Sequence, residues 1–567
     1  MNIPALAQNM SYKKTTVLAV VLIALVGFAV YFNSLDGKFI WDDDHLVKDN
    51  IYITNGIHFP TLFTTHIGSG ANIDYSSYRP LQIVTYTIDY SFWKLDVRGY
   101  HLTNIILHIL AAIALYWLIG VLFKNNLLAL LTSLFFVCHP IHTEAVSYIS
   151  GRADSLALLF MLLSLIFYIK KSGISYFFAL TCYVLALLSR ENAVMLIALV
   201  PLCCYSCKER INIKKLLPFL SVTLIYILLR VTFLSFHKAD PTTLFQRIPG
   251  FFAALTTYVK LLFFPFGLHM EYGNKFFSFT DPQVLVGISI LVLVLTLSFK
   301  KRQYNKVFFF SVWWFFLTLL PHSNLYPIPI AYMAEHWLYV PSIGFFLLLS
   351  YGLVRLYKTK TGRLFCAVGG LALLFFYSFL TVHYNSYWRH PKSLYERTVK
   401  YEPQSVRTLT SLAMEYEKEG REQDAIELFS RAISLDPKYA QAYNNLANLY
   451  VNIGKNAEAI KLYEEAIRVN PDYVEPYYNL GLEYSQVNNY EKAIEMYKKA
   501  LLISPNYAQI LNNLGVAYAS IGKLQTALAC FKKALSIYPE YVNARNNIKQ
   551  VYTLMGDNKK SEEAPFY

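Results

Sequence analysis

The stretch "FIWDDDHLVKDN", residues 39–50, places three consecutive aspartates, Asp42, Asp43 and Asp44, just after the first long apolar segment of the chain. Adjacent carboxylates repel one another, and charged carboxylates are costly beside a bilayer. A carboxylate whose pKa is raised by such surroundings can accept a proton as a general base. This stretch is therefore the first candidate for chemistry in the sequence.

The composition is that of a membrane protein. Hydrophobic residues make up 55% of the 567 residues and charged residues only 16%, which is too apolar for an ordinary soluble protein. The net charge of +14 falls on the apolar residues 1–400, so the basic residues suit loops beside membrane helices better than a nucleic-acid surface. The cysteines show no pairing framework, and the group Cys203, Cys204 and Cys207 lacks the further ligands of a zinc site.

Eleven apolar runs are long enough, or nearly so, to cross a bilayer. With the N-terminus in the cytosol, the basic loops that contain Lys124, Lys170, "KERINIKK", "KKRQYNK" and "KTKTGR" all face the cytosol, as the positive-inside rule requires. Segment 249–266 would break this pattern if it crossed, so it is expected to be a re-entrant or interfacial helix on the outer face. The expected spans are 15–33, 100–122, 127–142, 152–170, 174–189, 192–207, 216–236, 284–299, 306–321, 336–357 and 364–384.

This topology collects the unusual polar residues on the outer side of the membrane. Exposure of loops to water explains part of that polarity. It explains less well the density of His, Arg and Glu in connections as short as "HPIHTE" and "SREN". Ionisable groups held at membrane depth indicate a functional site. The residues at outer loops or span ends are Asp42, Asp43, Asp44, Arg79, His139, His142, Glu144, Arg152, Asp154, Arg190, Glu191, His322, Glu335 and His336.

The C-terminal part repeats with a period of 34 residues. Small residues at fixed positions let paired helices approach closely, and a proline at each boundary ends the second helix, which is typical of the tetratricopeptide repeat. The boundary prolines are Pro403, Pro437, Pro471, Pro505 and Pro539. The predicted repeats are 406–439, 440–473, 474–507 and 508–541, followed by a closing helix from about residue 542.

Asn445, Asn479 and Asn513 share one register on the first helix of three repeats and are expected to face the groove of the solenoid. An asparagine amide offers both a donor and an acceptor, so such a ladder can hold a peptide backbone whatever its sequence. Packing between the helices of the repeats explains the same residues equally well. In either case a concave solenoid surface predicts a protein or peptide partner.

The sequence thus predicts an all-α protein in two main parts. Residues 1–385 form a polytopic membrane helix bundle, in which 34–99 is the first extracytoplasmic loop. Residues 386–405 form a linker helix, 406–555 an α-solenoid of tetratricopeptide repeats, and 556–567 a flexible tail. The repeats are expected outside the cytosol, on a bacterial or archaeal cell membrane rather than in the endoplasmic reticulum.

Several motifs together resemble those of the transmembrane and tetratricopeptide repeat-containing O-mannosyltransferases, which are grouped with the C-type, polyprenyl-phosphate-dependent glycosyltransferases. The likeness covers nearly the whole chain. It departs from the family pattern at the third aspartate, Asp44, and at His336, where the family pattern has Arg after "AE". The motifs, in order ahead of the repeats, are "FIWDDDHLVKDN", "YRPLQIVTYTIDY", "GYHLTNIILHIL", "HPIHTEAVSYISGRADSLALLF", "LSRENAV" and "AEHWLYVPSIGF".

The resemblance implies a C-type glycosyltransferase fold and an enzyme that moves a hexose, mannose in that family, from a polyprenyl phosphate to Ser or Thr hydroxyls of protein. The lipid-linked sugar is a co-substrate, no cofactor is expected, and single displacement inverts the anomeric carbon. The family's acidic pair maps onto Asp42, as general base, and Asp43, which raises the pKa of Asp42 or orients the acceptor. Asp44 is expected to be a surface residue or a helix N-cap.

The leaving phosphate requires positive charge, and the planar fork of an arginine suits phosphate oxygens. Arg152 and Arg190 are the expected contacts, with snorkelling at a helix end as the alternative for each. Arg79 is either a substrate contact or part of the loop structure. A monophosphate needs less neutralisation than a diphosphate, so no metal is expected. The other expected donor-site residues are His139, His142 and Glu144, with Glu191, Glu335 and His336 in support.

Other functions stay open. A membrane-anchored repeat scaffold without activity fits the repeats but not the outer-face polar residues. A transporter fits eleven spans, but it predicts ionisable residues near mid-membrane and internal symmetry of the spans, neither of which the sequence contains. A transferase acting on a glycolipid or cell-wall polymer keeps the chemistry and changes the acceptor.

Overall fold

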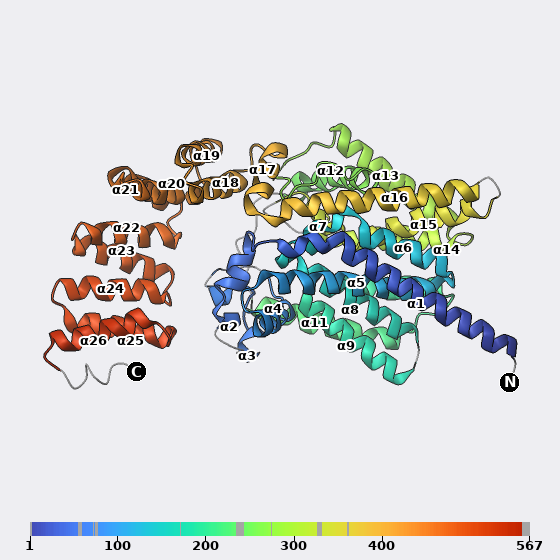
Figure 1. Cartoon of the computed structure of the whole chain (residues 1–567), viewed down its shortest axis with the longest axis horizontal. Helices are drawn as coiled ribbons and strands as arrows, with labels where there is room; N and C mark the ends of the chain where they lie inside the picture. Colours follow the sequence, from blue (N-terminus) through green and yellow to red (C-terminus); the bar gives the residue numbers. More distant parts are fainter. Residues whose placement is uncertain are drawn as a thin grey trace. The chain divides into compact units, whose positions relative to one another are not determined.

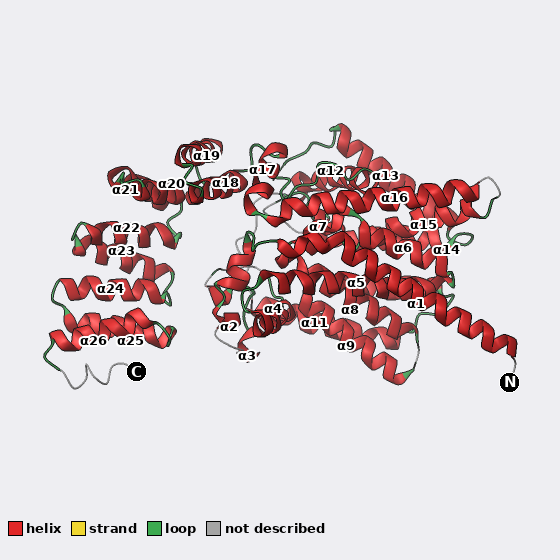
Figure 2. Ribbon diagram, viewed as in Figure 1, coloured by secondary structure: helices red, strands yellow, loops and turns green. Residues whose placement is uncertain are grey.

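The computed structural model consists of helices joined by short connections (Figures 1 and 2). It divides into two compact units, Met1–Tyr401 and Glu402–Tyr567. The prediction of an all-α fold is confirmed, since no strand occurs in the part of the chain that the structure describes. That part comprises residues 3–54, 59–71, 73, 77–170, 172–233, 243–273, 275–325, 331–359 and 362–557.

The first unit is a bundle of mostly apolar helices. Asparagine and serine side chains start several of them, since Asn125, Ser172 and Asn305 each accept a backbone N–H of the first turn that would otherwise have no partner. The helices are α1 (Ile3–Tyr31), α2 (Ile51–Thr54), α3 (Phe59–Leu62), α4 (Pro80–Trp93), α5 (Val97–Phe123), α6 (Asn126–Cys138), α7 (Thr143–Ser147), α8 (Arg152–Ile169), α9 (Gly173–Ser189), α10 (Leu196–Ser206), α11 (Ile213–Phe233), α12 (Leu244–Phe263), α13 (Pro282–Lys301), α14 (Lys306–Leu319), α15 (Ser342–Tyr357), α16 (Gly362–Asn385) and α17 (Pro391–Tyr401).

The apolar runs of the sequence fall on helices of this unit. Six helices in the described part of the chain are long and apolar enough to cross a membrane, and α6 with α7, bent by 55°, adds a seventh if the pair is one span. Four shorter apolar helices accompany them: α9, the helix beginning at Glu191, α14 and α15. α12, which contains most of segment 249–266, is not among these candidates. The count of eleven spans therefore stays a prediction.

Two of the candidate spans, α11 and α13, expose most of their side chains. Only 17% of the most apolar window of each is buried within the protein. Leu224, Ile225 and Leu228 of α11, for example, are each more than half exposed. Contiguous apolar surface of this size is unfavourable in water, so these faces suit contact with lipid.

Two of the helices that are expected to cross the membrane are shorter than its hydrocarbon core. α9 has 17 residues and α14 has 14. At 1.5 Å per residue they reach about 26 Å and 21 Å, less than the roughly 30 Å of a hydrocarbon core. Arg190 and Glu191, which follow α9, and His322, which follows α14, therefore need polar partners within the protein.

The second unit is a stack of antiparallel helix pairs. The turn within each pair passes through a left-handed residue: Gly420, Gly454, Asn488 and Gly522 have φ between 57° and 78° and lie 34 residues apart. Glycine and asparagine tolerate that conformation. The helices are α18 (Val406–Lys418), α19 (Glu422–Leu435), α20 (Ala440–Asn452), α21 (Asn456–Val469), α22 (Val474–Gln486), α23 (Tyr490–Ile503), α24 (Ala508–Ser520), α25 (Leu524–Ile537) and α26 (Val542–Leu554).

Candidate active site

The aspartate stretch forms a tight, partly buried loop after α1. Trp41 has a φ of 57°, which is rare for a bulky residue and marks local strain. The carboxylate of Asp43, 1% exposed, closes the loop: Oδ2 accepts the Ile40 N–H at 3.0 Å, and Oδ1 accepts the Ser150 N–H at 2.9 Å and the Ser150 hydroxyl at 2.5 Å. Asp43 thus joins the loop to the segment before α8.

The three aspartates have different surroundings. Burial raises the pKa of Asp43 to about 7, against the hydrogen bonds from Ser150 and Ile40, which lower it. Asp42 is half-buried, and its backbone N–H donates to the Tyr148 hydroxyl at 3.2 Å. Asp44 pairs with Lys48 at 2.7 Å, where both side chains are 42% exposed. The loop therefore fixes Asp43 inside the protein and leaves Asp42 closer to its surface.

The segment 146–150 that receives Asp43 is itself held by side chains of α4 and α5. The Asn104 amide donates to the carbonyls of Val146 at 3.2 Å and Tyr148 at 3.1 Å. Gln82 donates to the Ser150 carbonyl at 3.0 Å. These bonds satisfy backbone groups that no helix pairs, and so they fix where Ser150 meets Asp43.

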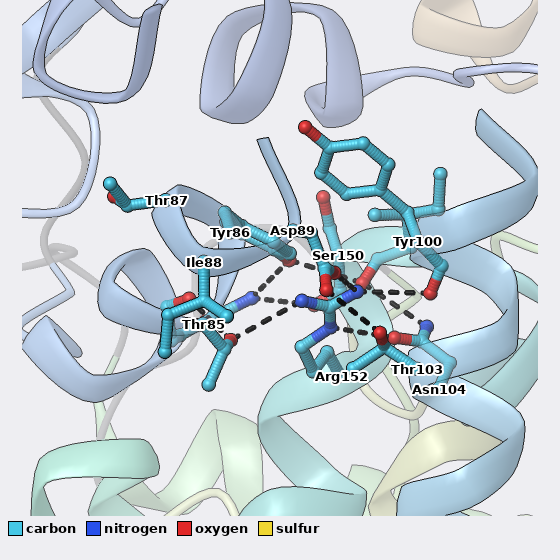
Figure 3. A network of polar contacts seen from close by, with 12 residues as sticks. Thr85, Tyr86, Thr87, Ile88, Asp89, Tyr100, Thr103, Asn104, Ser150 and Arg152 are labelled. Atoms are coloured by element: carbon cyan, nitrogen blue, oxygen red, sulfur yellow. Dashed lines mark hydrogen bonds and ion pairs between the residues drawn. The ribbon is translucent and has the colours of Figure 1, made fainter. Parts of the chain in front are cut away.

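Arg152 lies at the centre of this network and is fully buried (Figure 3). Its Nε donates to Asn104 Oδ1 at 2.7 Å, and its Nη2 donates to the Tyr100 carbonyl at 2.9 Å and pairs with Asp89 at 2.6 Å. Nη1 donates to Thr85, so every guanidinium nitrogen has a partner within the fold. Arg152 thus holds Asn104 in place, and through Asn104 it holds the segment before α8. Its guanidinium group is not free to bind a phosphate.

A second polar cluster joins the ends of α4, α8 and α9. Arg79, the residue before α4, donates to both carboxylate oxygens of Glu191, at 2.8 and 3.1 Å. Arg190 pairs with Asp154 in the first turn of α8. Asp154 also interacts electrostatically with Arg79, so the two pairs form one cluster.

Three buried side-chain nitrogens near this cluster have no hydrogen-bond partner among the residues that the structure describes. Arg190 Nε, Arg230 Nε and His322 Nε2 are buried and make no hydrogen bond to any residue that the structure describes. The His322 ring stacks on Trp337 with centroids 4.8 Å apart and interacts electrostatically with Arg190. Buried donors of this kind are costly unless an acceptor fills the space between them. An anion would satisfy them.

The remaining carboxylates hold the loop before α15. Glu144 accepts the His336 backbone N–H at 2.9 Å, and its other oxygen lies 2.6 Å from His336 Nδ1. Glu335 accepts the His269 N–H at 2.7 Å and the Tyr272 hydroxyl at 2.6 Å. Burial, followed by the nearby Glu144 charge, raises the pKa of Glu335 to about 8. Both residues thus have partners in loops rather than an open space before them.

His139 and His142 lie inside the bend between α6 and α7. His139 Nδ1 accepts the Ile141 N–H at 3.2 Å, and its Nε2 lies 3.2 Å from the Leu262 carbonyl. His142 Nδ1 lies 2.8 Å from the Phe136 carbonyl, and its Nε2 lies 3.0 Å from the Ser342 hydroxyl. A broken helix frees backbone groups that need partners, and these rings supply them. Neither ring nitrogen of either residue is left for a sugar or phosphate.

The asparagines of the repeats make contacts across repeat boundaries. Asn479 donates to Asn444 and to Asn448, both at 3.0 Å, and Asn513 donates to the Tyr478 hydroxyl at 3.1 Å. Asn445 lies 3.4 Å from the Met414 sulfur. All three are half-buried. Their amide N–H groups are engaged in helix packing, which is the second of the two roles expected for them.

Three residues of the site escaped sequence reasoning, Ser150, Asn104 and Arg230, and a fourth, His322, was expected at the outer face but without a role in the donor site. The first two are small polar residues whose roles come from contacts made far along the chain. Arg230 could have been identified from the sequence, because an arginine inside the apolar run "LIYILLRVTF" is unusual. His322 lies among the outer-face polar residues, but nothing in its sequence neighbours distinguishes it. No group of three metal-ligating side chains occurs among the described residues.

The C-terminal repeats match known families. Residues 438–503 and 508–541 match the family described as tetratricopeptide repeat, and residues 415–454 match TPR repeat. A crystal structure of MamA protein matches 27% of this chain and 83% of its own, with 33% identity and a TM-score of 0.24. The predicted tetratricopeptide repeats are confirmed.

The longer similarities extend into the membrane part. A protein O-mannosyl-transferase of Caenorhabditis elegans is 27% identical over 58% of this chain and 50% of its own length. A human protein O-mannosyl-transferase is 26% identical over 72% of this chain and 50% of its own length. The chain thus spans about half the length of these curated relatives. The resemblance to this group of proteins is confirmed.

Proposed function

We propose that this chain is a membrane glycosyltransferase that acts on Ser or Thr hydroxyls of proteins, because its homologues are protein O-mannosyl-transferases. The sugar is a hexose, mannose by analogy with those relatives. The donor is a polyprenyl phosphate carrying that sugar, and the anomeric carbon inverts. The observation that carries the proposal is the Asp42–Asp43 loop, in which one carboxylate is buried and fixed and its neighbour is half-buried.

In this mechanism Asp42 takes the proton from the acceptor hydroxyl as its oxygen attacks the anomeric carbon. The bond between that carbon and the phosphate oxygen breaks, and polyprenyl phosphate leaves from the opposite side. Asp43 keeps the loop in place through Ile40 and Ser150, and its negative charge raises the basicity of Asp42. Both carboxylates act outside the membrane spans, next to the hydroxyl of Tyr148.

We assign the phosphate to the cluster of Arg79, Arg190, Arg230 and His322. The buried Nε–H groups of Arg190 and Arg230 have no acceptor among the described residues, and His322 Nε2 has no partner there, which supports an anionic ligand near these groups. Glu191 and Asp154 hold Arg79 and Arg190 in position. This assignment replaces Arg152, His139 and His142 as donor contacts, because the polar atoms of these three are occupied within the fold.

The repeats would present the polypeptide acceptor. Tetratricopeptide repeats commonly bind proteins or peptides on their concave face. The amide oxygen of Asn479 accepts no hydrogen bond from the described residues, so it can still receive a peptide N–H while its amide nitrogen holds the neighbouring helix. This role can be tested by comparing sugar transfer to a protein acceptor with transfer to a short peptide.

The test is transfer of labelled hexose from polyprenyl phosphate by the purified full chain in nanodiscs, to a Ser/Thr-containing protein and to a short peptide. We expect transfer that is lost on substitution of Asp42 by Asn. Glycoproteomics on cells with and without the gene identifies the natural sugar and acceptor. Absence of any sugar transfer by a well-folded preparation, with no change in cellular glycopeptides, would exclude the proposal.

The proposed topology places the N-terminus in the cytosol and the repeats outside. Single cysteines at Ser278→Cys and Gln303→Cys, in a background without reactive native cysteines, should differ in labelling by an impermeant thiol reagent. Only the first should react from outside. Equal labelling of both positions from outside would show that α13 does not cross.

A further inference from the structure

An apolar groove of about 460 Å³ opens on the side of the first unit, and its lining includes neither the aspartate loop nor the cluster of Arg79, Arg190, Arg230 and His322. Its walls are α12, α13, α14 and α15, and Ser311 is the one polar side chain in the lining. On α15 the lining extends from Gly344 to Leu356. Leu356 lies twelve positions after Gly344, which corresponds to about 18 Å of helix, enough for much of an acyl chain.

Two glycines of α15 shape the groove in different ways. A Cβ added at Gly344 would lie 2.3 Å from the Ser311 carbonyl oxygen, so this glycine lets α15 pack directly on α14. A Cβ added at Gly352 would meet no atom within 4 Å. The missing side chain at Gly352 therefore leaves open space in the wall of the groove.

Basic residues gather where α13 and α15 end and α14 begins. Lys300 and Lys301 are in the last turn of α13 and Arg355 is in the last turn of α15. The lining residue Val294 precedes Lys301 by seven residues, or about 10 Å of helix, and Leu356 directly follows Arg355. One end of the groove therefore approaches a group of cations.

This basic end is built into the fold. Lys306, the first residue of α14, donates to the carbonyls of Tyr205 and Ser206, both at 3.1 Å, and the Tyr205 hydroxyl donates to the Arg302 carbonyl at 3.1 Å. Lys300, Lys301 and Arg302 are exposed beside it. The sequence contains no Asp or Glu between Pro282 and Ala334, so α13, α14 and their connection do not neutralise these charges.

We propose that the groove and its basic end bind one anionic phospholipid. The acyl chain lies in the groove, and the phosphate-bearing headgroup contacts Lys300, Lys301 and Arg302. A zwitterionic lipid would gain little from this concentration of positive charge. The proposal does not depend on the proposed enzyme activity.

The site is distinct from the proposed site for the phosphate of a sugar donor. His322, which belongs to that cluster, lies beyond the opposite end of α14. Lys306 and His322 are sixteen positions apart, or about 24 Å along a helix, so one phosphate cannot contact both ends. A phosphate bound at the basic end would therefore be a different group from the phosphate of the sugar donor.

The headgroup is tested by native mass spectrometry on the delipidated full chain, titrated with phosphatidylglycerol and with phosphatidylcholine of the same acyl chains. Each basic residue near an anionic headgroup is worth about fivefold in affinity. We therefore expect phosphatidylglycerol to bind at least about tenfold more tightly. The variant K300Q/K301Q/R302Q should lose this preference, whereas the control K358Q/R363Q, on a neighbouring basic loop, should keep it.

The groove is tested by Gly352→Leu, which fills its open wall, with the smaller Gly352→Val as a second variant. Either should weaken binding of both lipids, by about tenfold for Leu. Gly369→Leu on α16 is the matched control, because an added Cβ there also meets no atom within 4 Å. Equal binding of the two lipids by the unmodified chain, an unaltered affinity in the Gly352 variants, or displacement of phosphatidylglycerol by polyprenyl phosphate would overturn the proposal.

Discussion

Burial raises the pKa of Asp43 and the hydroxyl of Ser150 lowers it, and Ser150→Ala tests the second effect directly. The hydroxyl donates to Asp43 Oδ1 at 2.5 Å, while the backbone N–H of Ser150 and that of Ile40 also donate to the same carboxylate. The substitution removes one of these three hydrogen bonds and leaves the backbone donors in place. Because a hydrogen bond to a carboxylate stabilises its charged form, its loss raises the pKa of Asp43.

The size of this change follows from the energy of the bond. A hydrogen bond to a charged group contributes about 1.5–3 kcal/mol, and one pKa unit corresponds to about 1.36 kcal/mol, so the pKa should rise by about 1 to 2 units. Burial already places the pKa of Asp43 at about 7. About half of the carboxylates are then ionised at pH 7 in the unmodified protein, and about 1–10% in the variant. If the ionised form is active, the rate at pH 7 should fall about fivefold to fiftyfold.

The assay is the initial rate of sugar transfer between about pH 5.5 and 9.5. Activity should rise with pH through about 7 in the unmodified protein, because a pKa raised by burial keeps Asp43 protonated below that pH. In Ser150→Ala the rise should move by about 1 to 2 units to higher pH. The matched control is Ser147→Ala, which removes a buried hydroxyl that bonds Asn385 and not Asp43. An unchanged profile, or one displaced to lower pH, would refute the role given to Ser150.

Four further outcomes follow from the contacts. Asp42→Asn should lower the transfer rate by about 10²–10⁴, as for loss of a general base, whereas Asp44→Asn, which breaks an exposed pair with Lys48, should change it less than about tenfold. Arg152→Lys should lower kcat with little effect on the KM for the donor, and a rise in KM alone would show phosphate contact instead. Arg190→Gln should raise the KM for the donor by more than about tenfold, since it removes a charged donor to the phosphate, and an unchanged KM would exclude that contact. Asn479→Ala should lower the unfolding free energy by about 1–2 kcal/mol through two lost cross-repeat hydrogen bonds, measured by denaturant unfolding.

Much of the architecture was accessible from periodicity alone. Runs of apolar residues predict the helices of the first unit, and the 34-residue spacing of Pro437, Pro471 and Pro505 predicts the repeats, because both patterns are local in the chain. The bend between α6 and α7 was not accessible in this way. The sequence from 127 to 138 is mostly apolar, and whether the histidines that follow it bind a ligand or groups of the fold depends on the positions of α12 and α15.

The site shows the same limit. Resemblance to a family identified the aspartate loop and the arginines as groups of interest, but it did not identify the partner of each arginine. Arg152 reaches Asn104 and Tyr100, 48 and 52 residues away, so its use inside the fold appears only when the helices are assembled. Arg190 is also an arginine at a helix end, yet its buried Nε–H has no acceptor among the residues that the structure describes. Two residues with the same sequence signature therefore have different surroundings.

The side-chain bonds between neighbouring repeats have a consequence for how the gene can change. Asn479 reaches Asn444, Asn513 reaches Tyr478, and Asn547 reaches Asn512, in each case 35 residues back. A duplication or deletion of one whole 34-residue unit brings the same helix faces together again, so the array can lengthen or shorten in units of one repeat. A deletion of 33 or 35 residues rotates the helices after it by about 100° relative to those before it, and so separates the pair that spans the junction. Length variation among related genes should therefore occur in multiples of the repeat.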